Sequence, residues 1–204
     1  MGSGGDAVVY IKTNWVDGVT PLSATNMNKM EEGIADDGTW IKIAEQTLVS
    51  AVAQVDFASI PSGYKNFKIT FDAIKNSVNS TNLKLTFNSD STANYRYQLT
   101  RGYGSSTTSQ AAVGDNFIAI QSGLASSTQT PAYGQLEISN YNSLKAKRVT
   151  GRWYSESGVT AADLNNYSLG GVWANVSAEI NKISLAAYDN LIGIGSKFTL
   201  WGCK

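Results

Sequence analysis

The sequence contains no histidine and a single cysteine, and charged residues make up only 16% of it. Without histidine the chain lacks the commonest general base and the commonest metal ligand, and every His-dependent catalytic triad is excluded. Cys203 is the only cysteine, so no disulfide can form within the chain. We therefore predict a protein that is not an enzyme and that needs neither a metal nor another cofactor.

Strong charge of either sign is also missing, because sixteen basic residues balance sixteen acidic ones. The one short basic run is residues 145–148, which is too little for a nucleic-acid footprint. No apolar run approaches the length of a membrane span, and residues 1–5 lack the basic and apolar regions of a secretion signal. We expect neither nucleic-acid binding nor membrane insertion.

The carboxylates and amides allow two weaker hypotheses, one catalytic and one of metal binding. A pair of carboxylates could hydrolyse a glycosidic bond. The candidates, none of which lies in a recognisable motif, are Asp90, Asp115, Glu137, Glu156, Asp163 and Glu179. Residues 88–92 place oxygen groups at alternate positions, as calcium loops do, yet they lack the glycine and distal glutamate of such a loop. We expect an Asx-type turn there instead.

The chain divides into an N-terminal segment, residues 1–42, and a larger domain, residues 43–204. The segment holds one predicted helix over residues 24–32, with Ser23 as N-cap and a stop at Gly33. Its apolar stripe consists of Met27, Met30 and Ile34. Because so short a helix is marginal in water, it must pack either on its own domain or on copies of itself around an axis.

The larger domain repeats the alternation of half-buried strands. Phe67, Ile69 and Phe71 alternate with polar residues, and so do Leu83 and Leu85. Similar short runs continue to residues 198–201, separated by turns rich in glycine and serine. The pattern predicts a mainly β fold. Since the loops are long and uneven, we favour a jelly-roll-like β-sandwich preceded by the short helical attachment segment.

Two stretches resemble parts of known proteins. Residues 14–34, with Trp15, Pro21-Leu22, Asn26-Met27-Asn28-Lys29-Met30-Glu31 and Gly33-Ile34, resemble a segment that recurs near the N-termini of bacteriophage structural proteins. Residues 55–61 and 83–95, together with the closing run 198–202, are similar to β-sandwich domains at the tips of phage tail fibres. Position 89 departs from that pattern, because it carries serine where many such domains carry glycine.

The resemblance implies a fibre or appendage of a phage particle, located on the virion surface, homotrimeric and without catalytic activity. Met27, Met30 and Ile34 would then meet around the three-fold axis, and the N-terminal segment would dock onto other virion proteins. A host glycan would stack on aromatic side chains in the polar loops. The candidate ligand-binding residues are Tyr95, Tyr97, Tyr103, Tyr133 and Tyr154.

Other interpretations of the same residues stay open. Tyrosines on strands commonly fill the edge of a core with the hydroxyl in water. The protein could also be a capsid or baseplate decoration protein that binds only other virion proteins, which predicts a featureless tip. A third interpretation is a cellular carbohydrate-binding module, which would be monomeric.

Overall fold

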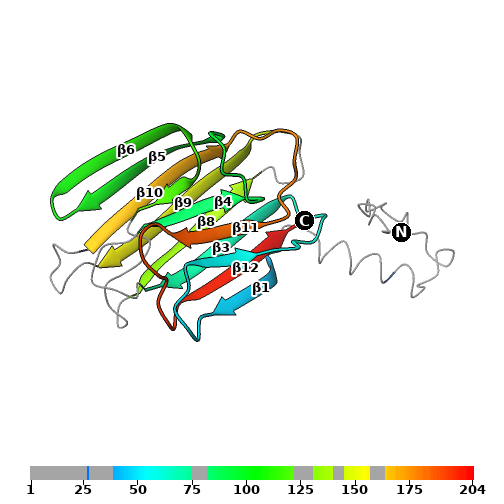
Figure 1. Ribbon diagram of the computed structural model, residues 1–204, viewed down its shortest axis with the longest axis horizontal. Coiled ribbons are helices and arrows are strands. Elements are labelled where there is room, and N and C mark those ends of the chain that lie inside the picture. The colour runs from blue at the N-terminus through cyan, green and yellow to red at the C-terminus, as the bar shows by residue number, and fades with distance from the viewer. Residues whose placement is uncertain (1–26, 28–38, 75–81, 122–130, 140–144, 157–163) are drawn as a thin grey trace, which may run out of the picture.

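The computed structural model describes residue 27 and residues 39–74, 82–121, 131–139, 145–156 and 164–204 (Figure 1). Within these residues the chain forms twelve strands, which pair into two antiparallel sheets. The prediction of a mainly β protein is confirmed. Met27 is helical and 48% exposed. Met30 and Ile34, with the rest of the predicted helix, lie outside the described residues.

The two sheets differ in size (Figure 1). The larger has eight strands in the spatial order β1 (Ile41–Thr47), β12 (Lys197–Cys203), β3 (Asn66–Ala73), β8 (Ala132–Ser139), β9 (Lys147–Glu156), β10 (Leu164–Trp173), β5 (Tyr95–Tyr103) and β6 (Ser106–Asp115). The smaller has four strands in the order β2 (Gln54–Phe57), β11 (Ile183–Ala187), β4 (Leu83–Phe87) and β7 (Ile118–Ile120). The predicted domain boundary at residue 42 falls within β1.

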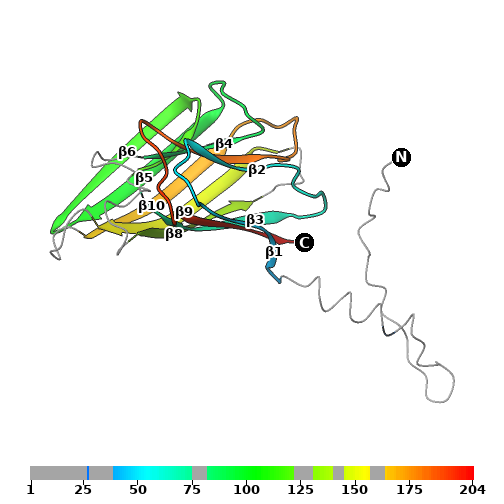
Figure 2. The same cartoon turned by 60° about the horizontal axis from the view of Figure 1, so that its bottom comes forward.

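The smaller sheet lies over one face of the larger, and their facing side chains form one hydrophobic core (Figure 2). In β3 every second residue is buried, from Phe67 to Ala73, and in β4 the buried residues are Leu83, Leu85 and Phe87. The alternation seen in the sequence therefore places one side of each strand in the core. Burying a large apolar side chain contributes about 1.5–3 kcal/mol, so this arrangement is consistent with a β-sandwich held by its core.

The strand register defines two ends of the larger sheet. Ile41, where the chain enters β1, pairs with Gly202 near the C-terminus, and we call this the attachment end. At the other end, which we call the far end, Asp72 pairs with Tyr133. The two ends are about 17 Å apart along β8, because a strand rises roughly 3.3 Å per residue. Residues 1–40 thus join the domain at the attachment end.

The turn from β4 to β5 contains two residues with positive φ, Asn88 at 53° and Ser89 at 57°. The left-handed region suits asparagine and glycine better than serine. Asn88 is held there by its amide, which donates to the carbonyl of Glu179 at 2.6 Å and accepts from the backbone N–H groups of Asn181 (2.9 Å) and Lys182 (3.1 Å). Ser89 is exposed and sits at the position where the sequence departed from its resemblance.

We expect Ser89→Gly to raise the free energy of unfolding by about 0.5–1 kcal/mol, because relief of the left-handed strain exceeds the extra entropy of the unfolded chain. Urea unfolding followed by tryptophan fluorescence measures the change. Asn88→Gly is the matched control at the adjacent positive φ: it removes three hydrogen bonds and should cost about 1–2 kcal/mol. Stabilisation by both variants would show that strain alone governs this turn.

Candidate functional site

A shallow hollow of about 440 Å³ opens on the larger sheet near its far end. It lies on the outward side, by which we mean the side of the larger sheet that turns away from the smaller sheet. Four neighbouring strands, β8, β9, β10 and β5, supply its lining residues: Thr100, Gly102, Tyr133, Gly134, Gln135, Arg152, Trp153, Tyr154, Asn166, Tyr167 and Ser168. The volume falls in the range of small-molecule sites.

The strand register arranges the lining as two parallel rows. The row nearer the far end is Tyr133, Tyr154, Asn166 and Gly102, and the second row is Gln135, Arg152, Ser168 and Thr100. The residues between the two rows, which include Gly134, Trp153 and Tyr167, face the core. Their backbone atoms therefore form the floor of the hollow. Gly102 has no side chain to close the row at β5, and a Cβ there would meet nothing within 4 Å.

Tyr133 and Tyr154 form an exposed aromatic pair at the mouth of the hollow. They are direct register partners on β8 and β9, their ring centroids are 5.7 Å apart, and their planes are inclined by 42°. Tyr133 is 47% exposed and Tyr154 is 45% exposed. Two adjoining rings with free faces offer an apolar surface to a flat ligand, while their hydroxyls remain in water.

The rest of the lining is polar and adaptable. Gln135 and Asn166 carry amides, Thr100 and Ser168 carry hydroxyls, and Arg152 carries a guanidinium. Together these groups donate and accept hydrogen bonds in several directions. Aromatic faces beside amides and hydroxyls match the alternating apolar faces and hydroxyl edges of a sugar ring.

The other predicted tyrosines lie elsewhere. Tyr95 and Tyr97 are 0% and 7% exposed in the core. The Tyr95 hydroxyl accepts from the backbone N–H of Phe87 at 2.9 Å and donates to the carbonyl of Asp90 at 3.1 Å, and burial raises the pKa of Tyr95. A surface ligand cannot reach either ring. We therefore remove both from the candidate site: here tyrosine fills the core.

Tyr103 is 40% exposed at the far end of β5. It falls on the same side of the strand as Tyr95 and Tyr97, opposite to the hollow, and the Arg101 guanidinium lies 4.7 Å from its ring centroid. Tyr103 is absent from the lining. Of the five predicted tyrosines, the structure therefore brings together only Tyr133 and Tyr154.

The polar members of the site were not predicted from the sequence; they are Thr100, Gln135, Arg152, Asn166 and Ser168. Each occupies an outward position of its strand, and all except Thr100, which precedes the half-buried Arg101, lie between two buried residues. That alternation was visible in the sequence, whereas the order of the strands was not. Only the pairing of β8 with β9, β9 with β10 and β10 with β5 makes these residues neighbours.

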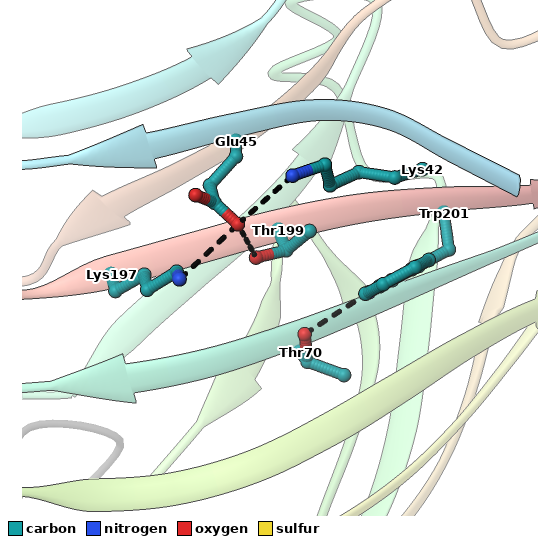
Figure 3. A network of polar contacts seen from close by, with 6 residues as sticks. All are labelled: Lys42, Glu45, Thr70, Lys197, Thr199 and Trp201. Atoms are coloured by element: carbon teal, nitrogen blue, oxygen red, sulfur yellow. Dashed lines mark hydrogen bonds and ion pairs between the residues drawn. The ribbon is translucent and has the colours of Figure 1, made fainter.

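Away from the hollow, the outward side near β1 is occupied by interactions within the chain (Figure 3). Glu45 accepts from Lys197 at 3.2 Å and from the Thr199 hydroxyl at 3.3 Å, and Lys42 lies 3.7 Å away. The hydrogen bond from Lys197 is the main cause of the lowered pKa of Glu45. The Trp201 indole donates to the Thr70 hydroxyl at 3.2 Å. These side chains already satisfy one another, so we do not place a ligand there.

Neither a metal site nor a membrane span is found in the described part of the chain. Those residues include no group of three or more Cys, Asp or Glu side chains that could hold an ion. Asp90, in the candidate calcium stretch, instead accepts the backbone N–H of Thr92 at 2.9 Å, as an Asx turn requires. A search of the same residues finds no helix with the length and hydropathy needed to span a bilayer.

Comparisons of the chain with protein-family models, with curated proteins and with solved structures give no match.

Proposed function

We propose that this chain is a non-enzymatic fibre or appendage protein of a bacteriophage particle, which binds a host-surface glycan as a homotrimer. The observation that carries the proposal is the hollow with its exposed pair, Tyr133 and Tyr154. It lies near the far end of the larger sheet, whereas residues 1–40 join at the attachment end. A particle anchored through its N-terminal segments would thus present the hollow outwards, towards a cell.

The strand order supports a jelly-roll-like fold within this proposal. Four adjacent strands of the larger sheet follow the order β1-β12-β3-β8, and the smaller sheet follows the order β2-β11-β4-β7. Along the chain the first four strands alternate between the sheets, and β11 and β12 return beside β2 and β1. Two such sets of four, connected as Greek keys, make a jelly roll, an architecture shared by viral capsid and lectin domains. Strands β9, β10, β5 and β6 extend the larger sheet beyond β8, and β9, β10 and β5 line the hollow together with β8.

The trimer is the part of the proposal that concerns the N-terminal segment. Met27, Met30 and Ile34 would pack around the three-fold axis. Three linked hollows would bind a repetitive cell surface more tightly than one, by about 10²–10⁴ in avidity. Shallow sites of modest individual affinity are sufficient for such a protein.

Binding to an array of bacterial surface polysaccharides, followed by calorimetric titration of the best ligand, tests this function. We expect Tyr133→Ala and Tyr154→Ala each to weaken binding at least about tenfold, because stacking on one ring is worth roughly 1–3 kcal/mol by analogy with base stacking. The unfolding temperature should change little, since both side chains are half exposed.

Tyr188→Ala is the matched control, because Tyr188 is 54% exposed and lies outside the hollow. It should leave binding unchanged. Light scattering on the same samples should give about three times the chain mass of 21.8 kDa. A monomer that binds glycan would favour a cellular carbohydrate-binding module, and a trimer that binds no glycan would favour a decoration protein.

A further inference from the structure

We propose that the hollow selects anionic saccharides, with Arg152 pairing a carboxylate or phosphate group on the sugar. This inference rests on the proposed glycan-binding function and adds the chemical class of the ligand. Arg152 stands in the middle of the second row, opposite Gln135 on β8 and Ser168 on β10. Both neighbours are neutral, so neither compensates the charge of the guanidinium.

Arg152 forms no ion pair within the described chain. Ion pairs there include those of Lys42, Lys182 and Lys197. Glu137 is the nearest outward carboxylate in register, but it pairs with Thr150 on β9 and with Lys68 on β3, so it lies only diagonal to Arg152. On the β1 half of the same outward side, by contrast, the carboxylate of Glu45 is held by two lysines (Figure 3).

The surroundings strengthen the positive character of this half of the sheet. Arg148 on β9 and Arg96 on β5 also point outward, on either side of Val172. The described outward side chains of β9, β10 and β5 carry these three arginines and no carboxylate. An anion that approaches Arg152 therefore meets arginines on these strands, while Glu137 on β8 and Asp72 on β3 are outward carboxylates on the other side of the hollow.

The geometry also suits a sugar that bears an acid. Arg152 and Tyr154 are two residues apart on the same side of β9, roughly 7 Å along the strand. A ring stacked on Tyr154 would thus place a substituent near the guanidinium. Arginine binds a carboxylate or a phosphate through two parallel hydrogen bonds, and the Gln135 amide and the Ser168 hydroxyl flank that position to bind the adjoining hydroxyls.

The test compares a tetragalacturonate with its fully methyl-esterified form, since esterification removes the charge and keeps the rings. A glycerol-phosphate polymer forms the third arm and distinguishes phosphate from carboxylate as the source of the anion. We expect the trimer to bind at least one anionic probe about tenfold or more tightly than the neutral ester. Affinity for the anionic probe should fall as salt rises, because screening weakens the ion pair.

Arg152→Gln should abolish this preference and reduce anion binding by about 10–100-fold, while binding of the neutral ester stays within about twofold. Arg152→Lys keeps the charge without the paired hydrogen bonds and should give an intermediate loss; it also serves if the glutamine variant fails to fold. Arg148→Gln, four residues away on the same side of β9, is the matched control outside the hollow.

The outcomes separate the two proposals. Equal binding of charged and neutral forms, unaffected by Arg152→Gln, would overturn the anionic preference and leave glycan binding standing. Loss of binding to both forms in Tyr133→Ala, with selectivity lost only in the Arg152 variants, would support both proposals. If no saccharide binds the folded trimer, both are overturned.

Discussion

Asp90→Ala is expected to lower the free energy of unfolding at neutral pH by about 2–4 kcal/mol. The Asp90 carboxylate accepts from the Trp173 indole at 2.7 Å, from the Asn94 amide at 3.0 Å, and from the backbone and hydroxyl of Thr92 at 2.9 and 2.5 Å. Trp173 is 0% exposed. Its indole N–H would be left buried without a partner, which costs about 1–3 kcal/mol, in addition to the lost charge-assisted bonds.

Urea unfolding monitored by tryptophan fluorescence measures this loss. Asp189→Ala is the matched control, because Asp189 is an exposed carboxylate in the turn that follows β11; it should change stability by less than about 0.5 kcal/mol. A similar loss in both variants would mean that Asp90 acts only through the charge of the whole chain.

The pH dependence of the unfolding free energy provides a second test of the hydrogen bonds to Asp90. Burial raises its pKa, but the hydrogen bonds from Asn94, Thr92 and Trp173 outweigh burial and bring the pKa to about 2, from an ordinary 3.8. The unfolded chain therefore takes up the proton first as pH falls. The stability that Asp90 contributes is complete above the ordinary pKa and is lost as pH falls towards 2. The unfolding free energies of the wild type and of Asp90→Asn should converge across that interval.

The alternation of inward and outward residues along each strand contains more information about the site than our predictions used. Tyr95 and Tyr97 occupy the same side of β5 as Leu99, and that apolar side was readable in the sequence. Tyr133 shares its side of β8 with Gln135, and Tyr154 shares its side of β9 with Arg152. A period-two reading of each strand therefore separates the core tyrosines from the surface pair.

The pairing between distant strands could not be predicted from the local sequence pattern. Thr100 and Gln135 are 35 positions apart in the sequence, and they line one hollow only because β9 and β10 lie between β8 and β5. Pairing between distant strands is decided by the packing of the whole core, which no single segment encodes.

Lys147 illustrates the same limit for a charged residue. It belongs to the short basic run 145–148, yet it is 0% exposed and donates to the carbonyl of Asn175 at 3.3 Å. Its ammonium lies 5.5 Å from the ring centroid of Trp173, its register partner on β10. Burial lowers the pKa of Lys147. Alternation assigns Lys147 to the inward side, but only the neighbouring aromatic ring and carbonyl explain how a lysine is accommodated there.

A glycine on β8, Gly134, is closely packed beneath the hollow. A Cβ at this position would stand 2.3 Å from the Cβ of Trp153, 2.8 Å from the Cζ of Phe71 and 2.9 Å from the carbonyl oxygen of Arg152. All three neighbours are fixed, since Phe71 and Trp153 are the register partners of Gly134 and both are buried. Glycine is thus required here by close approach of the adjacent strands.

Gly134→Ala is therefore expected to destabilise the protein by about 3 kcal/mol, at the upper end of ordinary overpacking, because no neighbour can move without disturbing the core. Glycan binding should weaken as well, since the substitution separates β8 from β9 and with them Tyr133 from Tyr154. Gly170→Ala is the matched control: Gly170 faces outward on β10, and a Cβ there meets nothing within 4 Å. It should leave stability unchanged or raise it slightly. Urea unfolding measures the stability of both variants, and titration with the glycan measures their binding. A Gly134→Ala protein as stable as Gly170→Ala would show that β8 and β9 are less rigidly packed than these distances require.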